Sequence, residues 1–106
     1  MDAPVLDRDH LARYTVGDSG LEAELFALLD GQIEACTRTL RTTADAEAWA
    51  AAAHTLKGAA RGVGAMALGA ACERAEARPL DPSALAAVLA AAEDARAAII
   101  AAQAAA

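Results

Sequence analysis

The sequence has few of the residues that build β-sheets. Only one Trp, one Tyr and one Phe occur among its 106 residues, and Val, Ile and Thr are sparse. Aromatic and β-branched side chains are enriched in strands, so their scarcity argues against a sheet protein. Alanine, the strongest helix former, makes up about a third of the chain. The composition therefore predicts an all-α fold.

Basic charge, metal ligands and long apolar runs are also scarce. Nine Lys and Arg stand against fifteen Asp and Glu, which gives a net charge of −6. Nucleic acids and anionic membranes bind basic surfaces, so we expect neither as a partner. Two Cys and two His supply too few ligands for a metal site, and we expect no cofactor. The sequence shows no signal peptide and no apolar run near the roughly 18 residues of a membrane span, which favours a cytoplasmic protein.

Apolar spacing, capping residues and turns predict five helices in one domain of residues 1–106. The predicted N-caps are Asp7, Ser19, Asp45 and Asp81, and Pro82 suits a first helical position. Short connections make successive helices antiparallel neighbours, so we expect an up-down-up-down four-helix bundle with a short additional N-terminal helix. The predicted helices cover residues 7–15, 20–42, 46 to the glycine-rich stretch at 61–64, 65–78 and 82–103.

Residues that recur every three or four positions predict the inward faces of the two longest helices. Cys36 and Cys72 lie on such apolar stripes, and we expect them to be buried small hydrophobes. The residues expected to face inward are Leu21, Leu25, Leu28, Leu29, Ile33, Cys36 and Leu40 in the helix at 20–42, and Leu85, Val88, Leu89, Ala92, Ile99 and Ile100 in the last helix.

His54 is predicted to lie on the solvent-facing side of its helix. At about 100° per residue, Lys57, Gly58 and Arg61 fall within about 60° of it, whereas Trp49 and the apolar residues of this helix fall on the opposite side. A neutral imidazole nitrogen can attack phosphorus, and nearby cations stabilise charge on phosphoryl oxygens. Glycine costs a helix up to about 1 kcal/mol relative to alanine, which suggests that Gly58 provides access for another molecule.

Glu76 is predicted to lie level with His54. Ten residues lead from His54 to the turn at Gly64, and twelve residues lead back to Glu76 along the next helix. A carboxylate there can accept a hydrogen bond from the imidazole Nδ1–H, which leaves Nε2 free to attack. The alternative is a surface carboxylate paired with Arg74 or Arg78.

An extended pattern begins at His54 and continues with Leu56, Lys57, Gly58, Gly64, Leu68, Cys72 and Glu76. This pattern resembles that of the histidine-containing phosphotransfer (HPt) family of multistep phosphorelays. The resemblance implies that His54 exchanges a phosphoryl group with an aspartate of a response-regulator receiver domain. It also implies that Lys57 steadies the phosphoryl oxygens, Gly58 gives clearance and Glu76 orients the ring. Arg61 stands where the family usually has a smaller residue, and it is expected to alter partner choice or add phosphate affinity.

The same resemblance implies partners of two kinds, receiver domains and a sensor or hybrid histidine kinase. Mg²⁺ in such exchanges belongs to the receiver. The sequence contains no glycine-rich phosphate loop and no kinase-type catalytic set, so we expect no ATP-dependent kinase activity of its own. Docking is expected on an apolar patch around the His54 face, with Leu11 and its neighbours on the first helix.

Other interpretations remain open at this stage. The chain can be a non-catalytic helical docking module in which His54 is incidental. Lys57 and Arg61 can be ordinary solvated helix charges. The glycines of the third helix can serve close packing or end the helix, and Gly62 has no functional interpretation.

Overall fold

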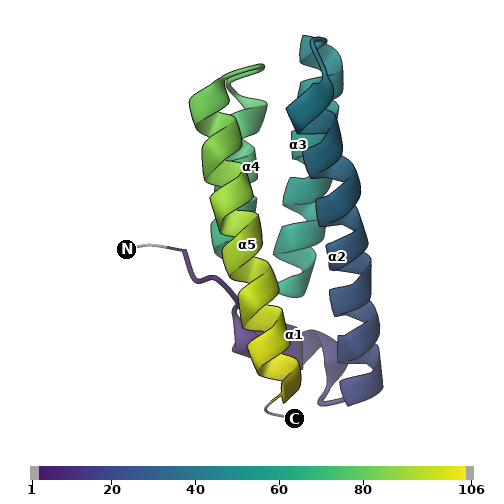
Figure 1. The fold of residues 1–106 in the computed structure, drawn as a ribbon. Helices are drawn as coiled ribbons and strands as arrows, with labels where there is room; N and C mark the ends of the chain where they lie inside the picture. The colour runs from purple at the N-terminus through teal and green to yellow at the C-terminus, as the bar shows by residue number, and fades with distance from the viewer. Residues whose placement is uncertain (1–2, 105–106) are drawn as a thin grey trace.

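The structure, a computed structural model, describes residues 3–104 and is all-helical over that range (Figure 1). No strand occurs among these residues, as the composition predicted. The five helices are α1 (Arg8–Thr15), α2 (Ser19–Thr42), α3 (Ala46–Val63), α4 (Met66–Glu76) and α5 (Pro82–Ala104).

Aspartate side chains set the helix starts. Asp7, Asp18 and Asp45 precede α1, α2 and α3, and each carboxylate accepts a hydrogen bond from a backbone N–H two or three residues on. Asp81 does the same before α5, where it accepts from the N–H of Ser83 at 2.9 Å. These bonds satisfy backbone donors that lack partners in the first helical turn. The prediction of Ser19 as the second cap was wrong, because Asp18 takes that place one residue earlier.

The four long helices form a closed ring, with neighbouring helices antiparallel (Figure 1). Cα atoms approach within 8 Å between α2 and α3, α3 and α4, α4 and α5, and α2 and α5. No such approach occurs across the diagonals, α2 to α4 or α3 to α5, in the described part of the chain. Helix α1 crosses the end of this bundle near the start of α2. The arrangement confirms the predicted architecture.

The core combines a few large apolar side chains with many alanines. Phe26, Leu29, Leu56 and Leu68 are at most 1% exposed. Trp49 is buried as well, and its Nε1–H donates to the carbonyl of Ala75 on α4 at 2.7 Å. This bond gives a buried polar atom its partner and ties α3 to α4.

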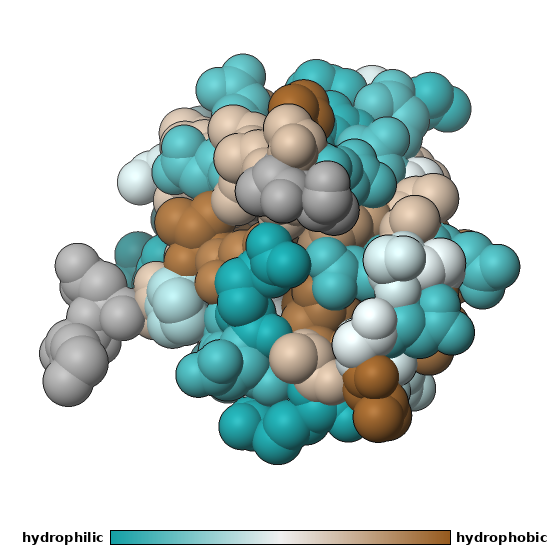
Figure 2. All heavy atoms as spheres, turned by 90° about the horizontal axis from the view of Figure 1, so that it is seen from below, coloured by the Kyte–Doolittle hydropathy of each residue, from teal (hydrophilic) through white to brown (hydrophobic). Residues whose placement is uncertain are grey.

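Two residues expected in the core face the solvent instead. Leu28 and Ile100 are each 66% exposed, whereas their neighbours Leu29 and Ile99 are buried. Successive residues lie about 100° apart around a helix, and at these two places the neighbouring helices cover only Leu29 and Ile99. At the end of the bundle that α1 crosses, hydrophobic residues are exposed among hydrophilic ones (Figure 2).

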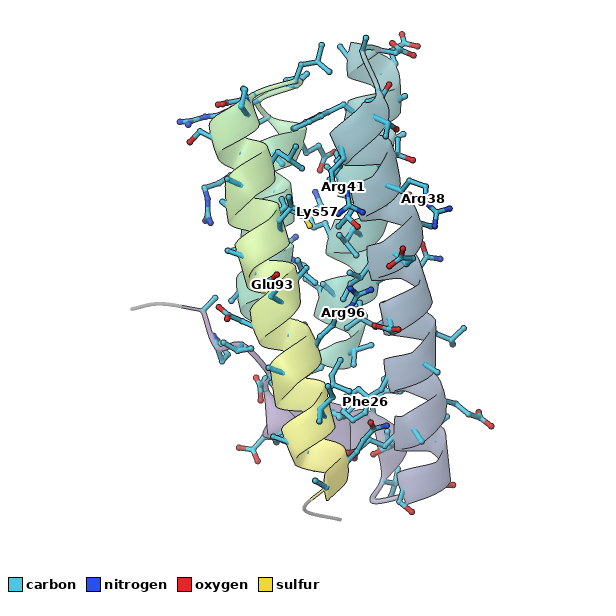
Figure 3. All side chains as sticks on the ribbon, in the orientation of Figure 1. Phe26, Arg38, Arg41, Lys57, Glu93 and Arg96 are labelled. Atoms are coloured by element: carbon cyan, nitrogen blue, oxygen red, sulfur yellow. The ribbon has the colours of Figure 1, made fainter. Side chains whose placement is uncertain are left out.

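Ion pairs bridge α2 and α5 at the surface of the seam between these two helices. Arg96 of α5 reaches across to α2 (Figure 3), where its Nε lies 2.7 Å from a carboxylate oxygen of Asp30. A second nitrogen of Arg96 lies 3.3 Å from Glu34. Phe26 fills the same seam from the inside, nearer the end that α1 crosses. This side of the bundle is therefore held by both charge and packing.

Candidate functional site

His54 projects from the middle of α3 into solvent. Its side chain is 68% exposed, whereas the opposite side of the helix, with Leu56, Ala60 and Val63, is buried in the core. The prediction that the imidazole faces outward is confirmed. A ring held outside the bundle can be reached by a second protein without any opening of the core.

Glu76 returns to the level of His54 at the end of α4. The tight turn at Gly64 reverses the chain, and the Nδ1 atom of His54 then lies 3.0 Å from Oε2 of Glu76. The other carboxylate oxygen, Oε1, accepts a hydrogen bond from Nζ of Lys57 at 2.6 Å. One carboxylate thus joins both residues of α3, and it pairs with neither arginine considered as its alternative partner.

The electrostatics of this cluster favour one tautomer of His54. The pKa of Glu76 is held below its ordinary value, chiefly by the hydrogen bond from Lys57. The charge of Lys57 and the interactions with His54 lower this pKa further, whereas partial desolvation raises it. Glu76 is therefore a charged acceptor at neutral pH. A charged acceptor opposite Nδ1 requires a donor there, so the proton of a neutral ring sits on Nδ1 and the lone pair of Nε2 is free.

Arg61 forms a second link between α3 and α4, away from Glu76. Its guanidinium donates to Glu73 at 2.9 Å. The arginine stem lies across Gly69, where an added Cβ would come within 2.9 Å of Cγ of Arg61. Gly69 therefore makes room for this side chain. The sequence interpretation missed that role, although counting residues around the Gly64 turn, as for Glu76, also places Gly69 opposite Arg61.

An uncharged groove of about 330 Å³ opens beside the site, between α3, α2 and α1. Gly58 and Gly62 line its α3 side, and Leu28 and Tyr14 line the facing side. Tyr14 is 65% exposed. Leu11, which was expected to contribute to this surface, is fully buried, because α1 turns that residue toward the bundle and presents Tyr14 outward. The sequence interpretation also gave no role to Gly62, which lines this groove.

The two cysteines are structural. Cys36 on α2 and Cys72 on α4 are both buried free thiols, which confirms the prediction. They lie on diagonal helices whose Cα atoms stay more than 8 Å apart, too far for a disulfide. Burial raises the pKa of Cys72 to about 12. Neither thiol is placed for nucleophilic chemistry.

No helix in the described range is long and apolar enough to span a bilayer. No curated protein and no solved structure matches the chain significantly. A family model does match: the model described as the Hpt domain covers residues 20–98, about three quarters of the chain. The match includes the outward His54, its hydrogen-bonded partner Glu76 and the turn between them. The chain therefore belongs to the Hpt family of phosphorelay phosphotransfer domains.

Proposed function

We propose that the protein is a phosphorelay intermediate in which His54 accepts a phosphoryl group on Nε2. The group comes from, or passes to, an aspartate of a response-regulator receiver domain. The observation that carries the proposal is the cluster that His54 and Lys57 of α3 form with Glu76 of α4. Hpt domains work with response regulators and histidine kinases, and these are the partners proposed for this chain.

The cluster supports transfer without movement of a proton on the ring. The Nε2 lone pair attacks the phosphorus of an aspartyl phosphate, the Nε2–P bond forms, and the P–O bond to the aspartate breaks with its electron pair left on the departing carboxylate. The ring keeps its Nδ1–H and becomes positively charged. Glu76, 3.0 Å from Nδ1, stabilises that charge. The reverse transfer follows the same path.

Lys57 and Gly58 supply charge and space for the incoming group. The ammonium of Lys57 has three N–H donors, of which Glu76 engages one, so the others can contact phosphoryl oxygens. A Cβ added to Gly58 would meet no heavy atom within 4 Å, so its absence leaves open space one turn beyond the imidazole. Arg61 lies about 10 Å along the helix from His54 and is proposed to contact the partner rather than the transferred group.

Mg²⁺, which such exchanges require, is proposed to be held by the receiver. The kinase of the relay is proposed to supply the phosphoryl group, because this chain has no phosphate-binding loop for ATP. Docking of the receiver is proposed on the groove beside Gly58, with Tyr14 and Leu28 in place of the buried Leu11.

The experiment is phosphorylation by a phosphorylated receiver domain and, separately, by the small donor phosphoramidate. We expect a label on the wild type that is lost in acid and stable in base, as a phosphoramidate bond is. His54→Ala should abolish the label. His10→Ala, the matched control at the only other histidine, should retain it.

The competing proposal is a docking module that carries no phosphoryl group, and the groove would serve it equally well. Absence of label from phosphoramidate and from every receiver tested would favour that module. Label that survives in His54→Ala would exclude His54 as the acceptor.

A further inference from the structure

Gly62 is a helical residue that neither packing nor backbone conformation requires to be glycine. It is exposed, and a Cβ added there would meet no heavy atom within 4 Å. Its φ angle is not in the left-handed region, which among the described glycines is adopted by Gly17 and Gly64. Alanine is favoured over glycine in a helix interior. The fold alone therefore does not explain this residue.

The surroundings of Gly62 point to contact with an apolar partner. It lies one turn beyond Gly58, and these two glycines add no side chains to the α3 side of the groove, which Ala59 and Val63 also line. Leu25 and Leu28 of α2 and Tyr14 of α1 face them. None of the lining residues is charged, although charged residues make up 23% of the chain. A charged group placed here would lose its water without gaining an ionic partner, which is costly. An apolar side chain can lose its water here without that cost.

We propose that Gly62 forms a slot that receives an apolar side chain of the receiver domain during phosphoryl exchange. The inference rests on the proposed function and identifies which part of that partner's surface meets this chain. The reactive site and the groove are continuous: each of the steps from His54 to Gly58 and from Gly58 to Gly62 advances about 6 Å along α3. A partner that brings an aspartyl phosphate to Nε2 and covers an interface of ordinary size therefore covers Gly62 as well.

The slot acts on docking and leaves the chemistry untouched. Gly62 lies about 12 Å along the helix from His54 and contacts none of His54, Lys57 and Glu76. A larger side chain at Gly62 would fill the space that the partner needs. It would raise the receiver concentration required for half-maximal transfer without changing the reactivity of the imidazole.

The test compares Gly62→Leu and Gly62→Ala with the control Gly31→Leu. Gly31 is an exposed glycine within α2, outside the groove, whose added Cβ also meets no atom within 4 Å. Two rates are measured for each variant: labelling of His54 by phosphoramidate, and transfer to the receiver domain that the wild type labels fastest among those of its own genome. Circular dichroism verifies that each variant keeps its helices.

We expect Gly62→Leu to lower kcat/KM for transfer by at least about tenfold, mainly through KM, as for a central interface residue. Labelling of Gly62→Leu by phosphoramidate should stay within about twofold of the wild type. The kcat/KM of Gly62→Ala for transfer should lie between those of Gly62→Leu and the wild type. Gly31→Leu should change neither rate.

Equal transfer by Gly62→Leu and wild type would overturn this inference and leave the proposed function intact. If the wild type is labelled by phosphoramidate but transfers to no receiver, both the proposed function and the proposed role of Gly62 are refuted. Sedimentation supplies a further outcome: a wild-type dimer that Gly62→Leu dissociates would place a second copy of the chain in the groove, contrary to the proposal.

Discussion

Replacing Gly64 with alanine would test how the N-terminal segment is fixed against the turn between α3 and α4. Gly64 caps α3 with φ of +90°. Its carbonyl accepts a hydrogen bond from the N–H of Asp7 at 2.7 Å, and the carbonyl of Pro4 accepts one from Ala67 at 2.8 Å. These two bonds hold the segment that leads into α1. An added Cβ at Gly64 would lie 2.8 Å from the carbonyl oxygen of Asp7, closer than real contacts allow.

Two costs add up in Gly64→Ala. A residue with a side chain pays about 1–2 kcal/mol in the left-handed conformation. Relief of the contact with Asp7 requires the backbone to shift, which weakens a hydrogen bond with a net worth of about 1 kcal/mol. The expected loss in the free energy of unfolding is therefore about 2–3 kcal/mol. At about 4–8 °C per kcal/mol for a domain of this size, Tm should fall by about 8–24 °C.

Thermal and urea unfolding, followed by circular dichroism, measure this loss. Gly17→Ala is the matched control, because Gly17 has φ of +78° but no atom within 4 Å of an added Cβ. It should lose only the conformational cost of about 1–2 kcal/mol. Since α1 carries Tyr14 of the groove, Gly64→Ala should also slow transfer to a receiver while labelling by phosphoramidate continues. Equal destabilisation of the two variants would refute the role assigned to the contact with Asp7.

Three further substitutions test the site itself. Gly58→Ala should raise the free energy of unfolding by up to about 1 kcal/mol and yet slow transfer. Gly31→Ala, the control, should give the same stabilisation with transfer unchanged. Equal transfer by both variants would contradict the proposal that Gly58 gives clearance to the partner. Lys57→Ala should slow transfer by at least about tenfold with helix content retained, because a fixed cation is lost beside the phosphoryl group, and an unaltered rate would count against that role. Lys57 lowers the pKa of Glu76 below its ordinary value of 4.5. The ionised carboxylate therefore stabilises the fold above pH 4.5, and this contribution is lost as the pH falls through the lowered pKa. The stability difference between wild type and Glu76→Gln in urea should therefore shrink below pH 4.5, and a difference that does not vary with pH would refute the coupling.

Much of the fold could be predicted from local signals. Aspartate caps, proline at the start of α5 and the glycine turn at Gly64 each act within a few residues, so the helix bounds follow from short stretches of sequence. The pairing of His54 with Glu76 could also be predicted, because two straight helices joined by a tight turn keep a fixed register. Periodicity was less informative for Leu28, since it identifies an apolar stripe but does not say how wide a face the neighbouring helices cover.

The groove depends on facts that only the assembled bundle supplies. Its walls come from three helices, so the direction of α1 decides whether Leu11 or Tyr14 faces the site. That direction is set by the bonds between Pro4 and Ala67 and between Asp7 and Gly64, which join segments about sixty residues apart. Long-range backbone bonds of this kind leave no periodic trace in a sequence. The reactive cluster therefore follows from one helical hairpin, whereas the surface proposed to recognise the partner requires the N-terminal segment to be fixed in place.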